Sequence, residues 1–178
     1  MFGNIWVNRL LSDWQLAPII RAISGRRFSV TTGSDNSRTG LNNDRPIQVG
    51  PNAYTTSKVC PLATQPCETY LSPVGIAFAA NPVGTFGNSA RNALQGPGAV
   101  NVDVTLSRSF PIHERIRLEV RFEAFNVINR ANFDNPTSGL SSSQFGLITQ
   151  TQQPPGGSVL LASVGDPRIQ QFAMKVHF

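Results

Sequence analysis

The sequence predicts an all-β fold of about five antiparallel strands, because three of its segments alternate apolar and polar residues. Two neighbouring segments, 99–110 and 115–128, alternate over most of their length, and a third, 168–178, does so at the end of the chain. A period of two residues places apolar and polar side chains on opposite faces of a strand. The short connection over residues 111–114 predicts that the first two strands form an antiparallel hairpin.

The polar face of the second strand carries an unusual row of charges. The four consecutive positions of this face alternate in sign: Arg117, Glu119, Arg121 and Glu123. Such a row would face bulk water in a soluble sheet. In a membrane β-barrel it would face a wet lumen, with the apolar face toward lipid. This strand alone leaves both classes open.

The segment 168–178 favours the barrel. Four apolar residues share one of its faces: Phe172, Met174, Val176 and Phe178. Lys175 and His177 share the other face. An alternating strand that ends on an aromatic residue resembles the signal that the barrel-assembly machinery reads in outer-membrane proteins. We therefore expect lipid on the apolar face, and the lumen beside Lys175 and His177.

Two further strands are expected near residues 3–11 and 14–32, joined by a tight turn at Ser12 and Asp13. Pro18 interrupts the second of them, since proline cannot donate a hydrogen bond to a neighbouring strand. We expect a β-bulge at Pro18.

Two long segments, 33–98 and 129–167, are rich in Gly, Pro, Asn, Ser and Thr. Loops of this length without structure are uncommon in compact domains but normal on the extracellular side of an outer-membrane barrel. If the C-terminus is periplasmic, both long loops fall outside and the 111–114 turn falls inside. Residues 145–149 then form a short strand within a loop above the membrane.

Composition argues against other classes. The net charge of +5 and the pI of about 10 would suit nucleic-acid binding, but the basic residues are scattered, so we expect no nucleic-acid partner. No run of 18 apolar residues is present, which excludes a transmembrane helix. Residues 1–6 lack the features of a signal peptide, so the chain is expected to be a fragment of an exported protein.

The chain resembles the C-terminal barrel region of Oar-like TonB-dependent receptors, which carry an N-terminal carboxypeptidase-regulatory-like domain. The resemblance follows the chain in order, through residues 11–16 (LSDWQL), 24–28 (SGRRF), 43–46 (NDRP), 87–92 (GNSARN), 96–98 (GPG), 121–129 (RFEAFNVIN), 132–133 (NF), 145–146 (FG) and 171–178. It implies an outer-membrane location, a barrel of about twenty-two strands with an internal plug, and energy supplied through TonB.

The expected partners follow from this resemblance. They are outer-membrane lipid, the barrel-assembly machinery, the missing N-terminal barrel and plug of the same protein, and TonB through the absent plug region. The expected function is that of a fragment of a transporter that imports a nutrient through a plugged barrel. The chain is expected to be a fragment because about five strands cannot close a barrel alone. The alternative is a soluble, secreted β-sheet module that binds a surface or a glycan.

Candidate sites for chemistry are few. Cys60 and Cys67, with six residues between them, are expected to form a disulfide in an oxidising compartment, the alternative being two loop thiols. Neither His113 nor His177 has neighbours typical of a catalytic triad, so we expect no enzymatic activity, cofactor or metal. Three asparagines near the end of the second strand could contact a ligand, although turn chemistry is favoured for them: Asn126, Asn129 and Asn132.

Overall fold

The computed structural model describes residues 12–62, 66–113, 115–152 and 167–178. The chain divides into two compact units. The sheet unit comprises Met1–Ala22, Val100–Ala131 and Pro154–Phe178, and the loop unit comprises Ile23–Ala99 and Asn132–Gln153. All regular secondary structure in the described ranges is β-strand, which confirms the all-β class. Within these ranges no helix is long and apolar enough to cross a membrane.

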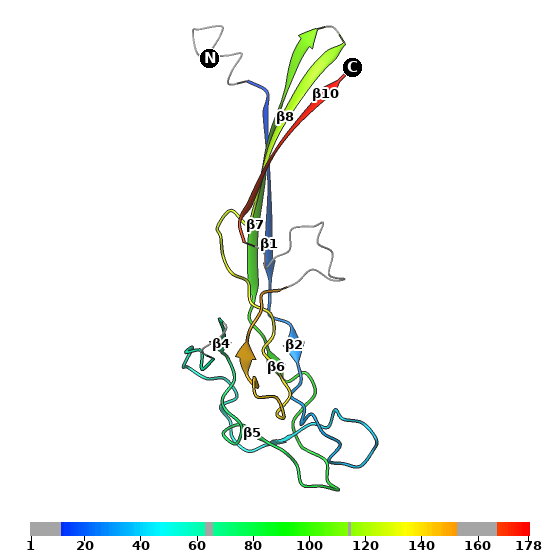
Figure 1. Cartoon of the computed structure of the whole chain (residues 1–178), viewed down its shortest axis with the longest axis vertical. Helices are drawn as coiled ribbons and strands as arrows, with labels where there is room; N and C mark the ends of the chain where they lie inside the picture. Colours follow the sequence, from blue (N-terminus) through cyan, green and yellow to red (C-terminus); the bar gives the residue numbers. More distant parts are fainter. Residues whose placement is uncertain (1–11, 63–65, 114, 153–166) are drawn as a thin grey trace. The chain divides into compact units, whose positions relative to one another are not determined.

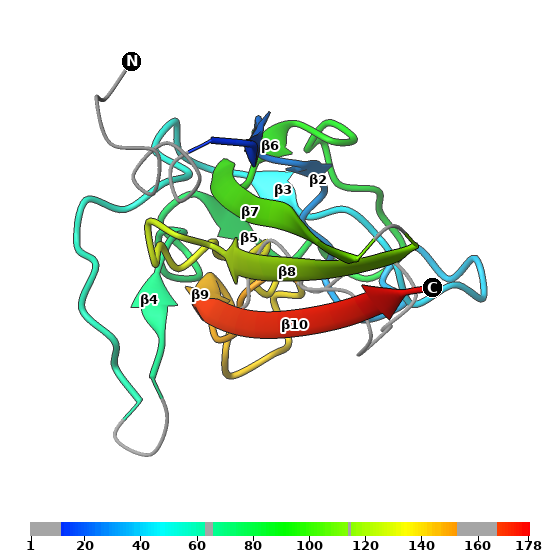
Figure 2. The ribbon, with the colours of Figure 1, turned by 90° about the horizontal axis from the view of Figure 1, so that it is seen from above.

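Four strands form the sheet of the sheet unit (Figure 1). They are β1 (Trp14–Ile23), β7 (Ala99–His113), β8 (Ile116–Phe125) and β10 (Ile169–His177), in the order β1-β7-β8-β10. β8 pairs antiparallel with both β7 and β10, and Figure 2 shows these three strands side by side. The strands β7, β8 and β10 correspond to the three alternating segments of the sequence.

The hairpin between β7 and β8 is tighter than expected. Pro111 pairs with Arg117 and His113 with Ile116, with a register shift between Pro111 and His113. Residues 111–113 therefore belong to the strand, and the expected 111–114 turn is wrong in its bounds. Pro111 fits there because the register shift locally interrupts the regular pairing, and proline is tolerated in strands at such irregularities.

β8 ends at Phe125, three residues earlier than the expected 115–128 strand. The reason lies at Asn126, whose φ of 48° is left-handed. A residue in this conformation cannot continue a strand, and Asn adopts it more readily than other non-glycine residues. Asn129 also has a positive φ, of 50°, so turn chemistry is confirmed at both positions.

β1 ends at Ile23, so the expected strand over 14–32 is too long. The chain leaves it at Gly25, where a Cβ atom would lie 1.7 Å from the carbonyl oxygen of Gly96, so only glycine fits. Trp14 and Arg21 contact residues on opposite faces of β7, as an unbulged strand requires, and the bulge expected at Pro18 is not needed. β1 is an edge strand of this sheet, where proline is tolerated. The strand expected over 3–11 lies outside the described residues.

The expected long loops over 33–98 and 129–167 are not structureless in their described parts. They contribute to three two-stranded antiparallel sheets of the loop unit. These pair β2 (Arg27–Phe28) with β6 (Leu94–Gln95), β3 (Ile47–Gln48) with β5 (Phe78–Ala79), and β4 (Glu68–Thr69) with β9 (Leu147–Ile148). The strand expected over 145–149 is β9, which is shorter and pairs with a strand from the other long segment.

The loop unit also has a hydrophobic core of its own. Its buried members are Phe28, Val30, Ala53, Leu71, Ala77, Phe78 and Leu94. Tyr70, Leu140 and Phe145 pack against this cluster. Burial of these side chains supplies the free energy that orders a segment rich in turn residues.

Candidate functional site

The registers of β7, β8 and β10 place like side chains in rows across the sheet. Thr105, Glu123 and Gln171 lie opposite one another in one row, and Leu106, Phe122 and Phe172 in the next. Because side chains alternate along each strand, the odd-numbered residues of these strands share one face and the even-numbered residues share the other. The sheet therefore has a polar face and an apolar face.

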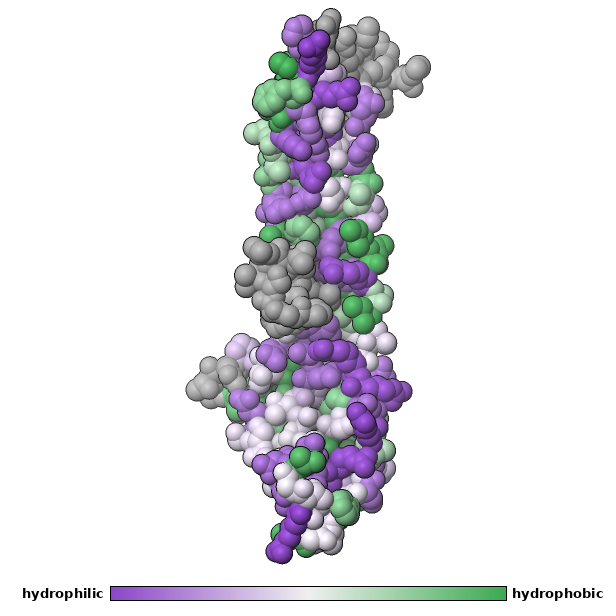
Figure 3. Space-filling model, turned by 90° about the vertical axis from the view of Figure 1, so that its right-hand side faces the viewer, coloured by the Kyte–Doolittle hydropathy of each residue, from purple (hydrophilic) through white to green (hydrophobic). Residues whose placement is uncertain are grey.

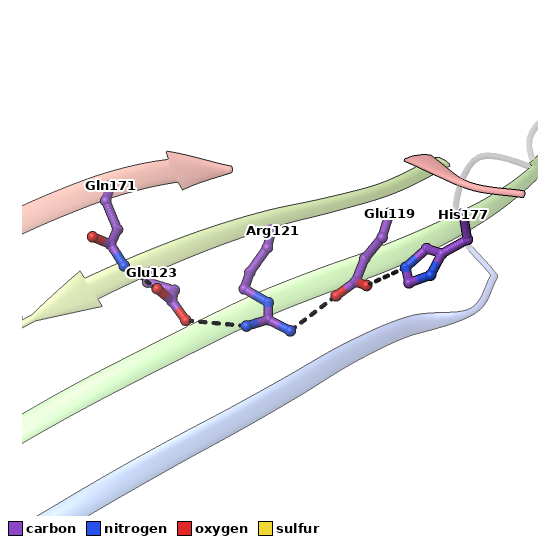
Figure 4. A network of polar contacts seen from close by, with 5 residues as sticks. All are labelled: Glu119, Arg121, Glu123, Gln171 and His177. Atoms are coloured by element: carbon purple, nitrogen blue, oxygen red, sulfur yellow. Dashed lines mark hydrogen bonds and ion pairs between the residues drawn. The ribbon is translucent and has the colours of Figure 1, made fainter. Parts of the chain in front are cut away.

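The polar face carries a continuous network of charged and amide side chains, drawn in Figure 4. The Arg121 guanidinium lies 2.9 Å from one oxygen of Glu119 and 3.7 Å from one oxygen of Glu123. The second oxygen of Glu119 lies 3.2 Å from Nε2 of His177. Gln171 donates to the second oxygen of Glu123. Each of the two carboxylates thus contacts two side chains and orients both of these partners.

The charge row predicted from the sequence is joined over only part of its length. Glu119, Arg121 and Glu123 contact one another, whereas Arg117 has no ion-pair partner within the described part of the chain. Gln171 and His177 extend the network from β10. Their contribution depends on the register between β8 and β10. These strands lie some forty residues apart in the chain, so no local sequence pattern gives their alignment.

A second polar cluster, centred on Asp103 of β7, was not predicted. One Asp103 oxygen accepts from the Arg21 guanidinium at 2.7 Å. The other accepts from Asn101 Nδ2 at 2.7 Å and from the backbone N–H of Asn126 at 2.9 Å. Asp103 therefore links β1, β7 and the end of β8. The one signal in the sequence is an acidic residue on a face otherwise lined by Ser, Thr and Asn.

The apolar face leaves large side chains exposed on β10. Phe172, Met174 and Val176 are 65%, 68% and 46% exposed, and their neighbours on β8 are Phe122, Val120 and Leu118. Figure 3 shows hydrophobic side chains of the sheet unit on its surface. A contiguous exposed apolar face of this kind marks a surface that contacts lipid or another apolar partner.

Arg108 is the exception on this face. It lies in the row of Val120 and Met174, yet it is only 5% exposed. Its guanidinium carbon lies 5.5 Å from the centroid of the Trp14 ring and 4.5 Å from that of Phe110. Two aromatic rings therefore cover the charge through cation–π contacts.

The loop unit holds most of the remaining predicted positions, and His113 lies in the sheet unit. Cys60 and Cys67 form a disulfide with their Cα atoms 5.0 Å apart. Beside it the Lys58 ammonium lies 2.8 Å from a Glu68 oxygen, and this carboxylate raises the pKa of Lys58 above its ordinary value. Asn132 is buried, and His113 ends β7. In the part of the chain that the structure describes, no group of three or more His, Cys, Asp or Glu side chains could hold a metal ion.

Comparison with known protein families gives a match over most of the chain. The family model described as the outer membrane beta barrel domain matches residues 1–171. No curated protein and no solved structure matches the chain. The matched range includes β1, β7 and β8 and the start of β10, the strands that carry the two faces. The chain therefore belongs to the outer membrane beta barrel domain family.

Proposed function

We propose that this chain forms part of the wall of a TonB-dependent outer-membrane transporter that imports a nutrient through a plugged barrel. The polar face of β7, β8 and β10 lines the lumen, and the apolar face contacts outer-membrane lipid. The loop unit lies on the extracellular side. The transport step itself is supported by the Oar-like resemblance of the sequence.

The observation that carries this proposal is the separation of the two faces. One face has an ordered network of ions and amides, from Glu123 to His177, and the other exposes Phe172, Met174 and Val176. In a soluble sheet the apolar face would be buried against a second layer. In a barrel it is the surface exposed to hydrocarbon, while polar side chains occupy the lumen.

The connections between strands support the orientation. β7 and β8 are joined by a short turn at one end of the sheet. At the other end the chain passes from Ile23 to Ala99, and from Phe125 to Ile169, through long segments. Outer-membrane barrels have short periplasmic turns and long extracellular loops.

The proposed partners follow from the same architecture. Four strands cannot close a barrel, so further strands of the same protein complete the wall. A plug domain contacts the charge network from inside, and TonB engages the plug. Phe172, Met174, Val176 and Phe178 form the surface that the barrel-assembly machinery inserts into lipid.

Epistasis in nutrient uptake tests this function. Strains that lack the gene for the full-length protein, TonB, or both are grown in a defined mixture of nutrients, and depletion of each nutrient is measured. We expect that the strain without this protein fails to deplete some of the nutrients that the strain without TonB fails to deplete. The strain that lacks both should fail to deplete the same nutrients as the strain without TonB. An additive defect in the double mutant would contradict TonB-dependent import.

A further inference from the structure

The loop unit contains a cavity of about 190 Å³ whose deep part belongs to the hydrophobic core. The buried lining residues are 9% exposed or less: Phe28, Val30, Ala53, Phe78, Ser89 and Leu94. The rim is exposed and consists of Gln48, Pro51, Tyr54, Ala90 and Ala93. The cavity is thus apolar at depth and open to solvent at its rim.

One polar side chain lies in the buried part of the lining. Ser89 is 5% exposed, and its Oγ atom has no hydrogen-bond partner within the described ranges of the chain. Buried hydroxyl groups are nearly always hydrogen-bonded, so this one has capacity for a partner inside the cavity.

The backbone that carries this hydroxyl is held in place by hydrogen bonds on both sides. The Ser89 N–H donates to the carbonyl oxygen of Pro46 at 3.1 Å. Asn88 accepts from the backbone N–H of Gln48 at 2.7 Å. A preorganised polar atom binds its partner with a smaller loss of conformational entropy.

The rim is held as well. The Tyr54 hydroxyl accepts from the backbone N–H of Gln95 at 2.8 Å and donates to the Gln95 carbonyl at 3.2 Å. Its ring lies edge-on to that of Tyr70, with the centroids 5.5 Å apart. Tyr54 is therefore a fixed wall of the opening.

These features specify a ligand class. None of the eleven lining residues carries a charge at neutral pH, which favours a neutral ligand. An apolar cavity of about 150 Å³ is large enough to bind benzene, so one aromatic ring fits the volume here. The buried hydroxyl of Ser89 favours one hydrogen-bonding group on that ring.

We propose that this cavity binds a neutral aromatic alcohol with a single ring, of the phenol class. The ring lies among Phe28, Val30 and Phe78, and the ligand hydroxyl exchanges a hydrogen bond with Ser89 Oγ. This site concerns the loop unit alone, and it is independent of whether the barrel imports anything.

Alanine methyl signals provide the test, because Ala53, Ala90 and Ala93 line the cavity. The full chain, labelled with ¹³C at alanine methyl groups and held in detergent micelles, is titrated with phenol and, separately, with toluene. We expect saturable ring-current shifts at these three methyl groups. Methionine methyl groups are labelled as well, because the methyl of Met174 on the apolar face of β10 reports nonspecific partitioning into detergent, and its shift should not saturate in parallel.

Two variants separate the hydroxyl from the cavity. Ser89→Ala should weaken phenol binding about three- to tenfold, the usual effect of one hydrogen bond, and should leave toluene binding within twofold. Ala93→Leu, at the exposed rim, should weaken both ligands. Absence of saturable shifts at the three methyl groups would overturn the site. Equal phenol affinity in Ser89→Ala and the unaltered chain would overturn the assignment of Ser89.

Discussion

Asp103 joins three parts of the sheet unit through its side chain. Its carboxylate accepts hydrogen bonds from Arg21, Asn101 and the backbone of Asn126, and its side chain is only 10% exposed. A buried carboxylate with three donors is costly to remove, because each donor then loses its partner.

Asp103→Leu should therefore lower the free energy of unfolding of the full chain by about 2–4 kcal/mol, since it leaves the Arg21 charge and two further donors unsatisfied. Ser107→Ala, on the same face of β7, should change it by no more than about 0.5 kcal/mol. Urea unfolding in detergent, followed by tryptophan fluorescence, measures both. Equal stability of the two variants would contradict the role of Asp103.

Asp44 shows how a single residue makes the loop unit sensitive to pH. It accepts hydrogen bonds from the Ser37 backbone N–H at 2.6 Å and from the Ser37 hydroxyl at 2.8 Å. These bonds hold the pKa of Asp44 below its ordinary value of 3.8. Because the folded pKa is the lower one, their contribution to stability is present above about pH 4 and is lost as the pH falls through the folded value.

Ser37→Ala removes the hydroxyl donor and keeps the backbone donor, so the pKa of Asp44 should rise part of the way toward its ordinary value. Loss of local order should then begin at a higher pH. An NMR titration of the Asp44 carboxyl carbon measures this shift, with Ser57→Ala as the matched exposed substitution. A pKa of Asp44 that stays unchanged in Ser37→Ala would show that the hydroxyl has no effect.

At the scale of the element, β10 alternates between the apolar and the polar face at each step along the chain. Met174 is on the apolar face and 68% exposed, and Lys175 is on the polar face opposite Glu119. A charge on the lipid face near the middle of the bilayer costs about 2–4 kcal/mol, whereas a lumen substitution costs little. Met174→Arg should therefore reduce the folded fraction sharply, and Lys175→Gln should have little effect.

The readout is heat-modifiable migration of the full-length protein from isolated outer membranes. Val176→Leu serves as the control on the same face, because it keeps an exposed apolar side chain there and should not reduce assembly. Normal assembly of Met174→Arg together with failure of Lys175→Gln would reverse the two faces. Folding of all three variants without detergent would contradict the membrane barrel and favour a secreted module.

The elements predicted from the sequence are those whose pattern is local. Alternation revealed β7, β8 and β10 and both of their faces, including the charges at Glu119, Arg121 and Glu123. It could not give the strand ends, because these depend on the pairing of Pro111 and on the left-handed backbone of Asn126.

Contacts between distant segments could not be predicted either, because alternation is a local pattern. The core of the loop unit joins Phe28 to Leu94, and β4 pairs with β9, without any periodic pattern in the sequence. The Gly, Pro and Asn residues of the two long segments predict loops without structure. In the loop unit they form the turns between segments that share a core. The cluster at Asp103 was missed because two of its donors, Arg21 and the Asn126 backbone, come from other strands.

For the whole molecule, the proposed orientation predicts which arginine is accessible from outside the cell. Arg38 is exposed in the loop unit, and Arg115 is exposed beside the turn between β7 and β8. Trypsin added to intact cells that carry the full-length protein should cleave at Arg38 and spare Arg115. Cleavage at Arg115 should require a permeabilised outer membrane, and the variant Arg115→Gln identifies that fragment by mass. Cleavage at Arg115 in intact cells would reverse the orientation.

The approach of Gly25 to Gly96 has a consequence for how such a protein can diversify. Gly96 N–H donates to the Arg26 carbonyl at 2.9 Å, and a Cβ on Gly98 would lie 3.1 Å from the Ile23 carbonyl oxygen. The excursion between β1 and β7 thus begins and ends at neighbouring points of the backbone. A longer or shorter segment between these two points could still join β1 to β7 without altering the pairing of those strands. An unrelated segment would also have to replace β4, which pairs with β9 outside it.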